Sequence, residues 1–192
     1  MTVNNFQYIE KFLQPTNEND FWFAQIIKRK KDNPDMNRSE RIIKSYNIKD
    51  YKHLIHFKEE IQLLCNYHNA RFYLNLNVRD LMLCHIKLIQ ALMDNIAQDI
   101  YSSIYSKVDS IFGSTTSPGR TKYWIADINE DDIALVNDLK DAIDDDNGKK
   151  SLVLKTLNGY HIVCEPFNRK EITYGEIKTN SPTLIYFKDE KK

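Results

Sequence analysis

Polar and acidic side chains gather directly after one hydrophobic segment in the second half of the chain. The segment Tyr123–Ile128 is rich in aromatic and β-branched residues, which is typical of a strand, and Asp127 lies near its end. Residues two apart share a face of a strand, so Asp127 and Asn129 are expected to point the same way. Hard divalent cations take oxygen ligands. The pattern therefore predicts a Mg²⁺ or Mn²⁺ site at Asp127, with Asn129 or Glu130 as a weaker ligand.

The acidic residues that follow have a second interpretation. Negative charge stabilises the first turn of a helix, and Asn is a favourable N-cap residue. We therefore expect Asp131 and Asp132 to begin a helix that Asn129 caps. For Asp127 both a structural role and a role in a site stay open.

A histidine lies two residues after a glycine in the segment Gly159–Glu165, which is predicted to be a strand. Glycine beside a strand residue lets a ligand or another backbone approach closely. The imidazole of His161 could donate to a phosphate oxygen or bind a cation. A hydrogen-bonded structural histidine is the alternative.

A third polar segment, Tyr174–Pro182, contains Glu176 as a further candidate metal ligand. Lys178 and Asn180 follow it at intervals of two residues and are candidates for binding a nucleotide or nucleic acid. A solvated loop acid is the alternative interpretation of Glu176.

The segment Arg71–Arg79 alternates strictly between polar and apolar residues, which predicts a strand with one apolar face. Its other face carries Arg71, Tyr73, Asn75, Asn77 and Arg79. Guanidinium groups suit phosphates, and amide or phenol groups suit sugar and base edges. We interpret Arg71, Tyr73, Asn75 and Arg79 as a path for a nucleotide or nucleic acid, with an ordinary exposed sheet face as the alternative.

The remaining patterns predict the elements that position these residues. Strands are expected at 21–28, 71–79, 123–128, 151–156, 159–165 and 183–187, and helices at 51–67, 80–100 and 131–144, with a short amphipathic element at 6–13 and an extension of the long helix at 101–112. This order predicts an α+β fold with a mostly antiparallel central sheet and helices packed on one face.

Charge is balanced overall but not along the chain. The formal net charge is zero, yet residues 28–58 contain ten Lys or Arg against four acids, including Arg29, Lys30 and Lys31. Residues 127–146 contain nine acids against one lysine. The basic segment could extend a polyanion path, and the acidic segment could bind cations. Two solvated helix faces are the alternative.

The composition excludes several classes of protein. The three cysteines are far apart and odd in number, which favours free thiols over a disulfide framework or zinc site. We expect no signal peptide and no membrane span, and hence a cytoplasmic location. With only five glycines, the chain has no dinucleotide-binding or P-loop motif, and it has no GxSxG nucleophile elbow.

Three of these segments together resemble the motifs of archaeo-eukaryotic primases. Asp127-Ile128-Asn129 resembles the first motif, a strand ending in Asp-x-Asp, and Gly159-Tyr160-His161 resembles the second, a small residue followed by x-His. Tyr174–Asn180 resembles the third, with Glu176 as its acid and Asn180 four residues later, as in end-joining polymerase domains. Three residues depart from the family pattern: Asn129 replaces a second Asp, Glu176 replaces Asp, and Gly175 is not apolar.

The resemblance covers roughly residues 71–188 and implies an RRM-like catalytic core there, preceded by helices and a strand in 1–70 of a single domain, 1–192. The chain also resembles small proteins of tailed phages that infect Bacteroidetes, in the segments 70–77, 158–161 and 180–186. A phage origin would make the location the host cytoplasm.

The resemblance implies a nucleotidyltransferase of the primase-polymerase type, dependent on Mg²⁺ or Mn²⁺ and acting on nucleic acid and nucleoside triphosphates. Asp127, His161 and Glu176 would be its catalytic residues. Three alternatives stay open: a non-catalytic nucleic-acid-binding replication accessory protein, a metal-dependent nuclease, and a phage factor that binds a replication or host protein.

Overall fold

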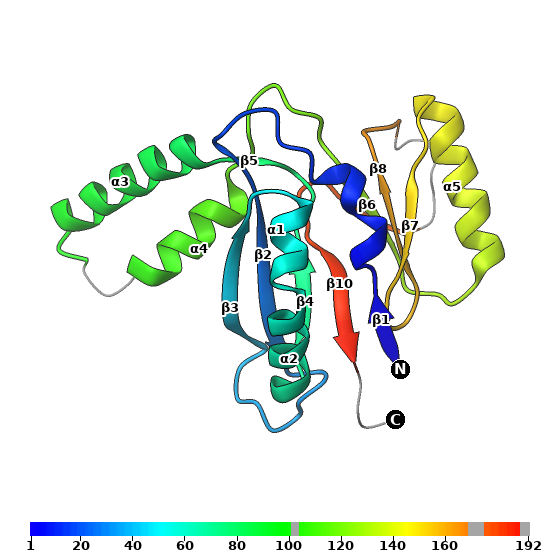
Figure 1. Ribbon diagram of the computed structural model, residues 1–192, viewed down its shortest axis with the longest axis horizontal. Helices are drawn as coiled ribbons and strands as arrows, with labels where there is room; N and C mark the ends of the chain where they lie inside the picture. The colour runs from blue at the N-terminus through cyan, green and yellow to red at the C-terminus, as the bar shows by residue number, and fades with distance from the viewer. Residues whose placement is uncertain (101–103, 169–174, 189–192) are drawn as a thin grey trace.

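The strands of this α+β protein divide between two sheets, and every strand pairing described is antiparallel (Figure 1). The computed structural model describes residues 1–100, 104–168 and 175–188. The predicted α+β class with mostly antiparallel pairing is confirmed. The prediction of one central sheet with helices on one face is wrong, because there are two sheets and the helices pack on more than one face. The strands form two neighbouring layers, and this division creates the space between the layers that is described below.

The larger sheet takes strands from both ends of the chain. Its order is β1 (Thr2–Asn4), β10 (Thr183–Lys188), β4 (Arg71–Leu74), β2 (Asp20–Arg29) and β3 (Glu40–Ile48), and β5 (Arg79–Asp80) pairs with the start of β2. Strands from before and after residue 70 therefore share one sheet.

The smaller sheet is formed by a continuous part of the sequence. Its order is β7 (Leu152–Lys155), β8 (Tyr160–Cys164), β6 (Trp124–Ile128) and β9 (Glu176–Lys178). The first strand in sequence, β6, thus lies between the third and the fourth.

The helices cover different faces of the sheets, and three of them begin at side-chain caps. The helices are α1 (Tyr51–His56), α2 (Lys58–His68), α3 (Leu81–Ala97), α4 (Ile104–Ser114) and α5 (Ile133–Asn147), and two short 3-10 turns occupy Phe6–Tyr8 and Glu10–Phe12. The carboxylates of Asp50, Asp80 and Asp132 accept backbone N–H groups at the starts of α1, α3 and α5, which satisfies donors that a helix leaves unpaired. The predicted cap of the last helix, Asn129, is therefore wrong by three residues.

Strand β2 is apolar on both faces over its first half because a different set of elements covers each face. Trp22 and Ile26 pack into the main core with Leu54 of α1 and Ile61 of α2. On the opposite face, Phe21 and Phe23 pack with Cys84 and Phe112, from α3 and α4. Beyond Phe23 this second face carries Gln25, Ile27 and Arg29.

Helix α5 covers the outer face of the smaller sheet (Figure 1). Val136, Leu139 and Ile143 pack there against Ile128 and other residues of β6 and β8. Since neighbouring strand residues point to opposite faces, Asp127 and His161 point away from α5. The two sheets therefore enclose the polar face of the smaller one.

The predicted strand Arg71–Arg79 is divided in two. Strand β4 ends at Leu74, and the Asn75 side chain accepts the backbone N–H of Asn77 at 3.0 Å, a local hydrogen bond that turns the chain out of the sheet. All nine residues from 71 to 79 are buried, so the alternative of an exposed sheet face is wrong.

Three strands were not predicted, and they are short or exposed at an edge: β1, β3 and β9. Strand β10, predicted at 183–187, is inserted between β1 and β4 of the larger sheet. None of the helices in the described ranges combines the length and the apolar character that crossing a membrane requires.

Candidate active site

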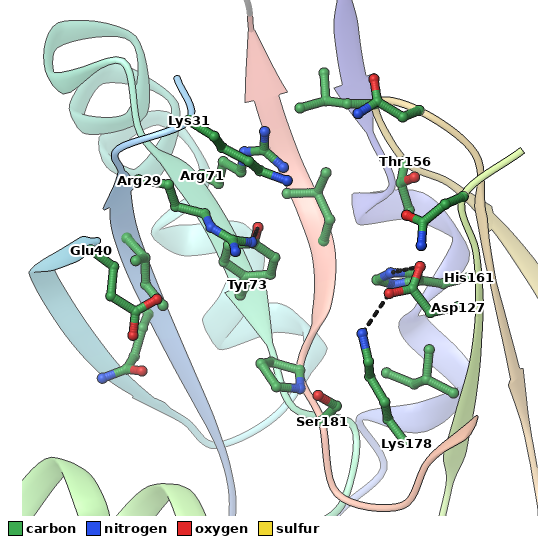
Figure 2. A pocket seen from close by; sticks show the side chains of 18 residues that line it. Arg29, Lys31, Glu40, Arg71, Tyr73, Asp127, Thr156, His161, Lys178 and Ser181 are labelled. Atoms are coloured by element: carbon green, nitrogen blue, oxygen red, sulfur yellow. Dashed lines mark hydrogen bonds and ion pairs between the residues drawn. The ribbon is translucent and has the colours of Figure 1, made fainter. Parts of the chain in front are cut away.

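A cleft of about 390 Å³ lies between the two sheets, and polar side chains line both of its walls (Figure 2). Its volume is within the range of small-molecule sites in proteins. One wall is the face of β6, β8 and β9 that points away from α5. The other is formed by β2 and β4, on the face opposite α1 and α2, together with the start of β10.

Asp127 is at the centre of the first wall because its strand lies between those that carry the other two predicted catalytic residues. In the antiparallel register it is paired with His161 on one side and with Glu176 on the other. Directly opposed residues share a face of the sheet. Three residues separated by 34 and 15 positions in sequence are thus neighbours, as the sequence interpretation required.

The carboxylate of Asp127 is held by two basic side chains. Lys178 donates to its Oδ2 at 2.6 Å, and His161 Nε2 lies 3.4 Å from its Oδ1. The Lys178 ammonium also lies 3.1 Å from Glu176 Oε2, so one cation bridges both acids. The hydrogen bond with His161, and then the one with Lys178, hold the pKa of Asp127 well below its ordinary value despite burial. Burial lowers the pKa of Lys178, but its two carboxylate partners outweigh that effect and raise it.

His161 connects the two sheets. Its Nδ1 lies 2.8 Å from the hydroxyl of Thr183, a fully buried residue of β10 in the larger sheet. Because Asp127 is ionised and only accepts, the imidazole Nε2 carries the hydrogen that points toward it. This pair of contacts fixes the ring and leaves its edge in the cleft.

The opposite wall carries three basic side chains, Arg29, Lys31 and Arg71 (Figure 2). Arg71 makes a two-pronged ion pair with Asp32, at 2.7 Å and 2.6 Å, and its guanidinium lies over the Phe187 ring. Arg29 donates to the Tyr73 hydroxyl at 3.1 Å. These contacts hold both guanidinium groups in place, which reduces the entropy that a bound anion would have to remove.

The side chains that line the cleft carry more positive than negative charge, and two of these cations are already paired, Arg71 with Asp32 and Lys178 with Asp127 and Glu176. Four Lys or Arg side chains line the cleft (Arg29, Lys31, Arg71 and Lys178), against the carboxylates of Glu40 and Asp127. Burial, followed by the charges of Arg71 and Arg29, lowers the pKa of Lys31. Cations crowded at this spacing favour an anion between them. The geometry therefore suits a ligand that carries several phosphates.

Other predicted binding residues lie beside the cleft. Asn75 and Asn180 line a smaller adjoining pocket of about 220 Å³, which shares Gln25 and Tyr73 with the cleft. Asn75 Nδ2 donates to Asn180 Oδ1 at 3.1 Å. These two residues therefore come together close to the cleft.

Arg79 is fully buried and lines neither pocket. It donates to the Asn180 side-chain oxygen at 3.1 Å and to the carbonyl of Gly113 at 2.6 Å. Burial lowers the pKa of this guanidinium to about 10. Arg79 therefore holds the Asn180 side chain in place, and its guanidinium is not accessible to a ligand in the cleft.

The four predicted metal ligands differ in how close they lie to the cleft. Asp127 and Asn129 line the cleft, the Glu176 side chain is mostly exposed at its rim, and Glu130 is exposed outside it. In the described parts of the chain, no three His, Cys, Asp or Glu side chains are arranged to hold a metal ion. The oxygen donors nevertheless fit a cation, since Asp127 and Glu176 already share the Lys178 ammonium.

Sequence reasoning missed Glu40, which lines the cleft, and Thr183 and Asp32, which contact His161 and Arg71. Thr183 is in a predicted strand and Glu40 is in a segment to which no element was assigned. No sequence motif beside either residue indicates a role in a site. Asp32 lies in a run of basic residues, where a single acidic side chain is expected to be exposed to solvent. Only the pairing of distant strands identifies these residues.

Comparison with protein-family models, with curated proteins and with solved structures finds no match for this chain.

Proposed function

We propose that the chain is a nucleotidyl-transfer protein of the primase-polymerase type, and that the cleft between its sheets binds the phosphates of a nucleoside triphosphate. One observation carries the proposal. The three residues singled out by their resemblance to primase motifs, Asp127, His161 and Glu176, are paired on adjacent strands. Asp127 and His161 line a cleft whose other wall is basic, and Glu176 lies at its rim.

The order of strands in the smaller sheet supports the same proposal. The sequence β6-α5-β7-β8-β9 folds with β6 between β8 and β9, and β7 outside β8. This is the strand order of the split β-α-β arrangement, on which an RRM-like core is built. The sheet faces its ligand with the side that α5 leaves uncovered.

Each residue of the cleft has a role that follows from its position. Arg29, Lys31 and Arg71 bind phosphate oxygens from one wall. On the other wall, His161 positions the Asp127 carboxylate, and the imidazole contacts a phosphate only if it exchanges Asp127 or Thr183 for it. Tyr73, Asn75 and Asn180 offer an aromatic ring and amides for the sugar or base in the adjoining pocket. Asp127 and Glu176, with Asn129, would hold Mg²⁺ or Mn²⁺, which supplies compensation for negative charge on the phosphoryl oxygens. Lys178 then becomes free to contact a phosphate.

The test is primer synthesis and primer extension by the purified protein with a template, Mn²⁺ or Mg²⁺, and dNTPs or NTPs. We expect a product that Asp127→Ala reduces at least about a hundredfold. Lys155→Ala is the matched control, because Lys155 pairs with the exposed Asp131, whose side chain lies outside the cleft. Activity that survives Asp127→Ala refutes the assigned roles.

A second candidate is a metal-independent nucleotide- or nucleic-acid-binding protein. The bridge from Lys178 to both acids favours it, since a built-in ammonium then neutralises the carboxylates permanently. This candidate predicts single-strand or nucleotide binding that weakens steeply with salt, does not change with Mn²⁺, and yields no extension product.

A further inference from the structure

Helix α3 has apolar side chains on two opposite faces. One face packs against α4, where Cys84 and Leu88 contact Phe112 and its neighbours. The other face is exposed along its whole length. It carries Met82, Ile86, Ile89, Met93 and Ile96, which are between 45% and 65% exposed, and Ile100 lies just beyond the helix end. We call these residues the α3 stripe.

The α3 stripe follows a heptad pattern. Its members are separated alternately by four and three residues, from Met82 through Ile100. This spacing keeps apolar side chains on one seam of a helix that pairs with another helix. A helix that is apolar on both sides is normally buried on both. The stripe therefore has the geometry of one half of a coiled coil.

The position of α3 leaves the stripe accessible. Helices α3 and α4 extend together away from the two sheets as a hairpin (Figure 1). The hairpin is in contact with the body at its base, through Phe21 and Phe23 of β2. Within the described ranges, the six stripe residues are all exposed, so a partner helix can approach without displacing part of this chain.

We infer that α3 pairs with α3 of a second copy of the chain, in antiparallel orientation. The stripe complements itself when it is reversed about Ala91: Ile86 then lies opposite Ile96 of the second copy, and Ile89 opposite its Met93. The four central positions of the stripe thus each meet an apolar position, while Ile100 follows Asp99, whose positive φ of 56° ends the helical row.

The position of the bodies selects the orientation. Lys87 and Asp94, the only Lys, Arg, Asp or Glu residues between Leu81 and Ala97, lie on the side of the helix away from the stripe, so neither orientation places a charge in the seam. Antiparallel pairing keeps the two bodies, which lie at the Leu81 end, at opposite ends of the seam, whereas parallel pairing brings them side by side.

Sedimentation equilibrium of the full chain tests the pairing. We expect a dimer that dissociates on dilution within about 1 to 100 µM, the range of a modest interface. Ile89→Glu places a charge in the centre of the seam and should weaken the dimer at least about tenfold. Leu63→Glu, at an exposed apolar position of α2, is the matched control and should leave the dimer unchanged. Circular dichroism verifies that both variants fold.

Disulfide trapping tests the orientation. A mixture of Ile86→Cys and Ile96→Cys proteins should form a mixed disulfide dimer under mild oxidation, whereas each protein alone should not. The native cysteines are buried and give little background. Cross-linking of each variant with itself, but not in the mixture, would indicate parallel pairing and overturn the proposed orientation.

Two results overturn the inference itself. One is a monomer at every concentration. The other is a dimer that Ile89→Glu does not weaken, since the copies then associate through another surface. Loss of vesicle binding in Ile89→Glu, with a monomeric wild type, would assign the stripe to a lipid surface instead. The inference does not depend on the proposed function, because neither measurement uses a nucleotide.

Discussion

Gly159 lies directly against the end of β6, where a β-carbon on this residue would overlap the carbonyl oxygen of Ile128 and come within 2.9 Å of its carbonyl carbon. The two residues are adjacent to the register pair that faces the cleft, since Ile128 is paired with Tyr160 and Asp127 with His161. The small residue before His161 therefore has a geometric purpose: it lets β8 begin close enough to β6 to set His161 beside Asp127.

Gly159→Ala should separate the ends of β6 and β8. A clash with backbone atoms cannot be relieved by a side-chain rotation, so we expect a loss of about 1 to 3 kcal/mol in the free energy of unfolding, measured by urea denaturation. Gly113→Ala is the control, because a β-carbon there meets only the Phe23 ring, at 3.4 Å. Equal stability of Gly159→Ala and wild type would contradict the close approach.

Lys178→Met should increase the affinity of the free protein for Mn²⁺ by about tenfold, a change of about 1.4 kcal/mol. The ammonium that bridges Asp127 and Glu176 competes with a metal ion for the same oxygens, and methionine removes the competitor. Electron paramagnetic resonance of unbound Mn²⁺ measures this without nucleotide or activity. Lys155→Met should bind as wild type does, and an unchanged affinity in Lys178→Met refutes the competition.

Asp127→Asn should destabilise the protein at neutral pH by about 1 to 3 kcal/mol, as expected when a partly buried carboxylate loses charged partners. The pKa of Asp127 is lowered in the folded state, mainly by His161, so its contribution is present above the ordinary Asp pKa of about 4 and is lost as pH falls below it. Denaturation at several pH values should show the two proteins converging below about pH 4. If the difference in unfolding free energy between the two proteins stays constant down to acidic pH, ionisation of Asp127 does not contribute to stability.

Arg79→Ala should cost about 2 to 4 kcal/mol, because it leaves a cavity and removes the donor from Gly113 and Asn180. Arg79→Met keeps most of the volume and removes a buried charge whose Nε and Nη1 have no hydrogen-bond partner in the described structure. We expect Arg79→Met to be more stable than Arg79→Ala in thermal unfolding. The reverse order would mean that the charge itself stabilises the fold.

The sequence predicts the local elements of this protein better than their assembly. Amphipathic spacing identifies the helices around residues 51–67, 80–100 and 131–144, since each buries one face. The alternation of Arg71–Arg79 is misleading, because a strand with one polar and one apolar row of side chains is usually exposed on its polar face. Here both rows are buried. Asn75 accepts the backbone N–H of Asn77, the Asn77 side chain donates to the Tyr123 carbonyl, and Arg79 donates to Asn180 and Gly113.

The candidate site could be predicted only in part. Asp127, His161 and Glu176 could be selected because each stands out locally, after a strand, after a glycine or within a polar segment. The basic wall could not be assigned, because it depends on β2 and β4 lying opposite β6, a relationship between residues about 55 to 100 positions apart. The ion pairs of Lys178 with Asp127 and Glu176 could not be predicted either. Alternation along a strand shows which residues share a face, but it does not show which charged side chains from different strands are in contact.

Strand β10 lies between β1 and β4, yet among the strands in the described part of the chain it comes last in sequence. During synthesis the larger sheet therefore lacks an interior strand until the ribosome has released residues 183–188, and the edges of β1 and β4 stay unpaired up to that moment. The nascent chain reaches its native state after translation of this segment, and a message cut short upstream of it yields a product with two open edges, prone to aggregation or proteolysis. Thr183, which holds His161, arrives in the same step, so completion of the sheet and assembly of the cleft coincide.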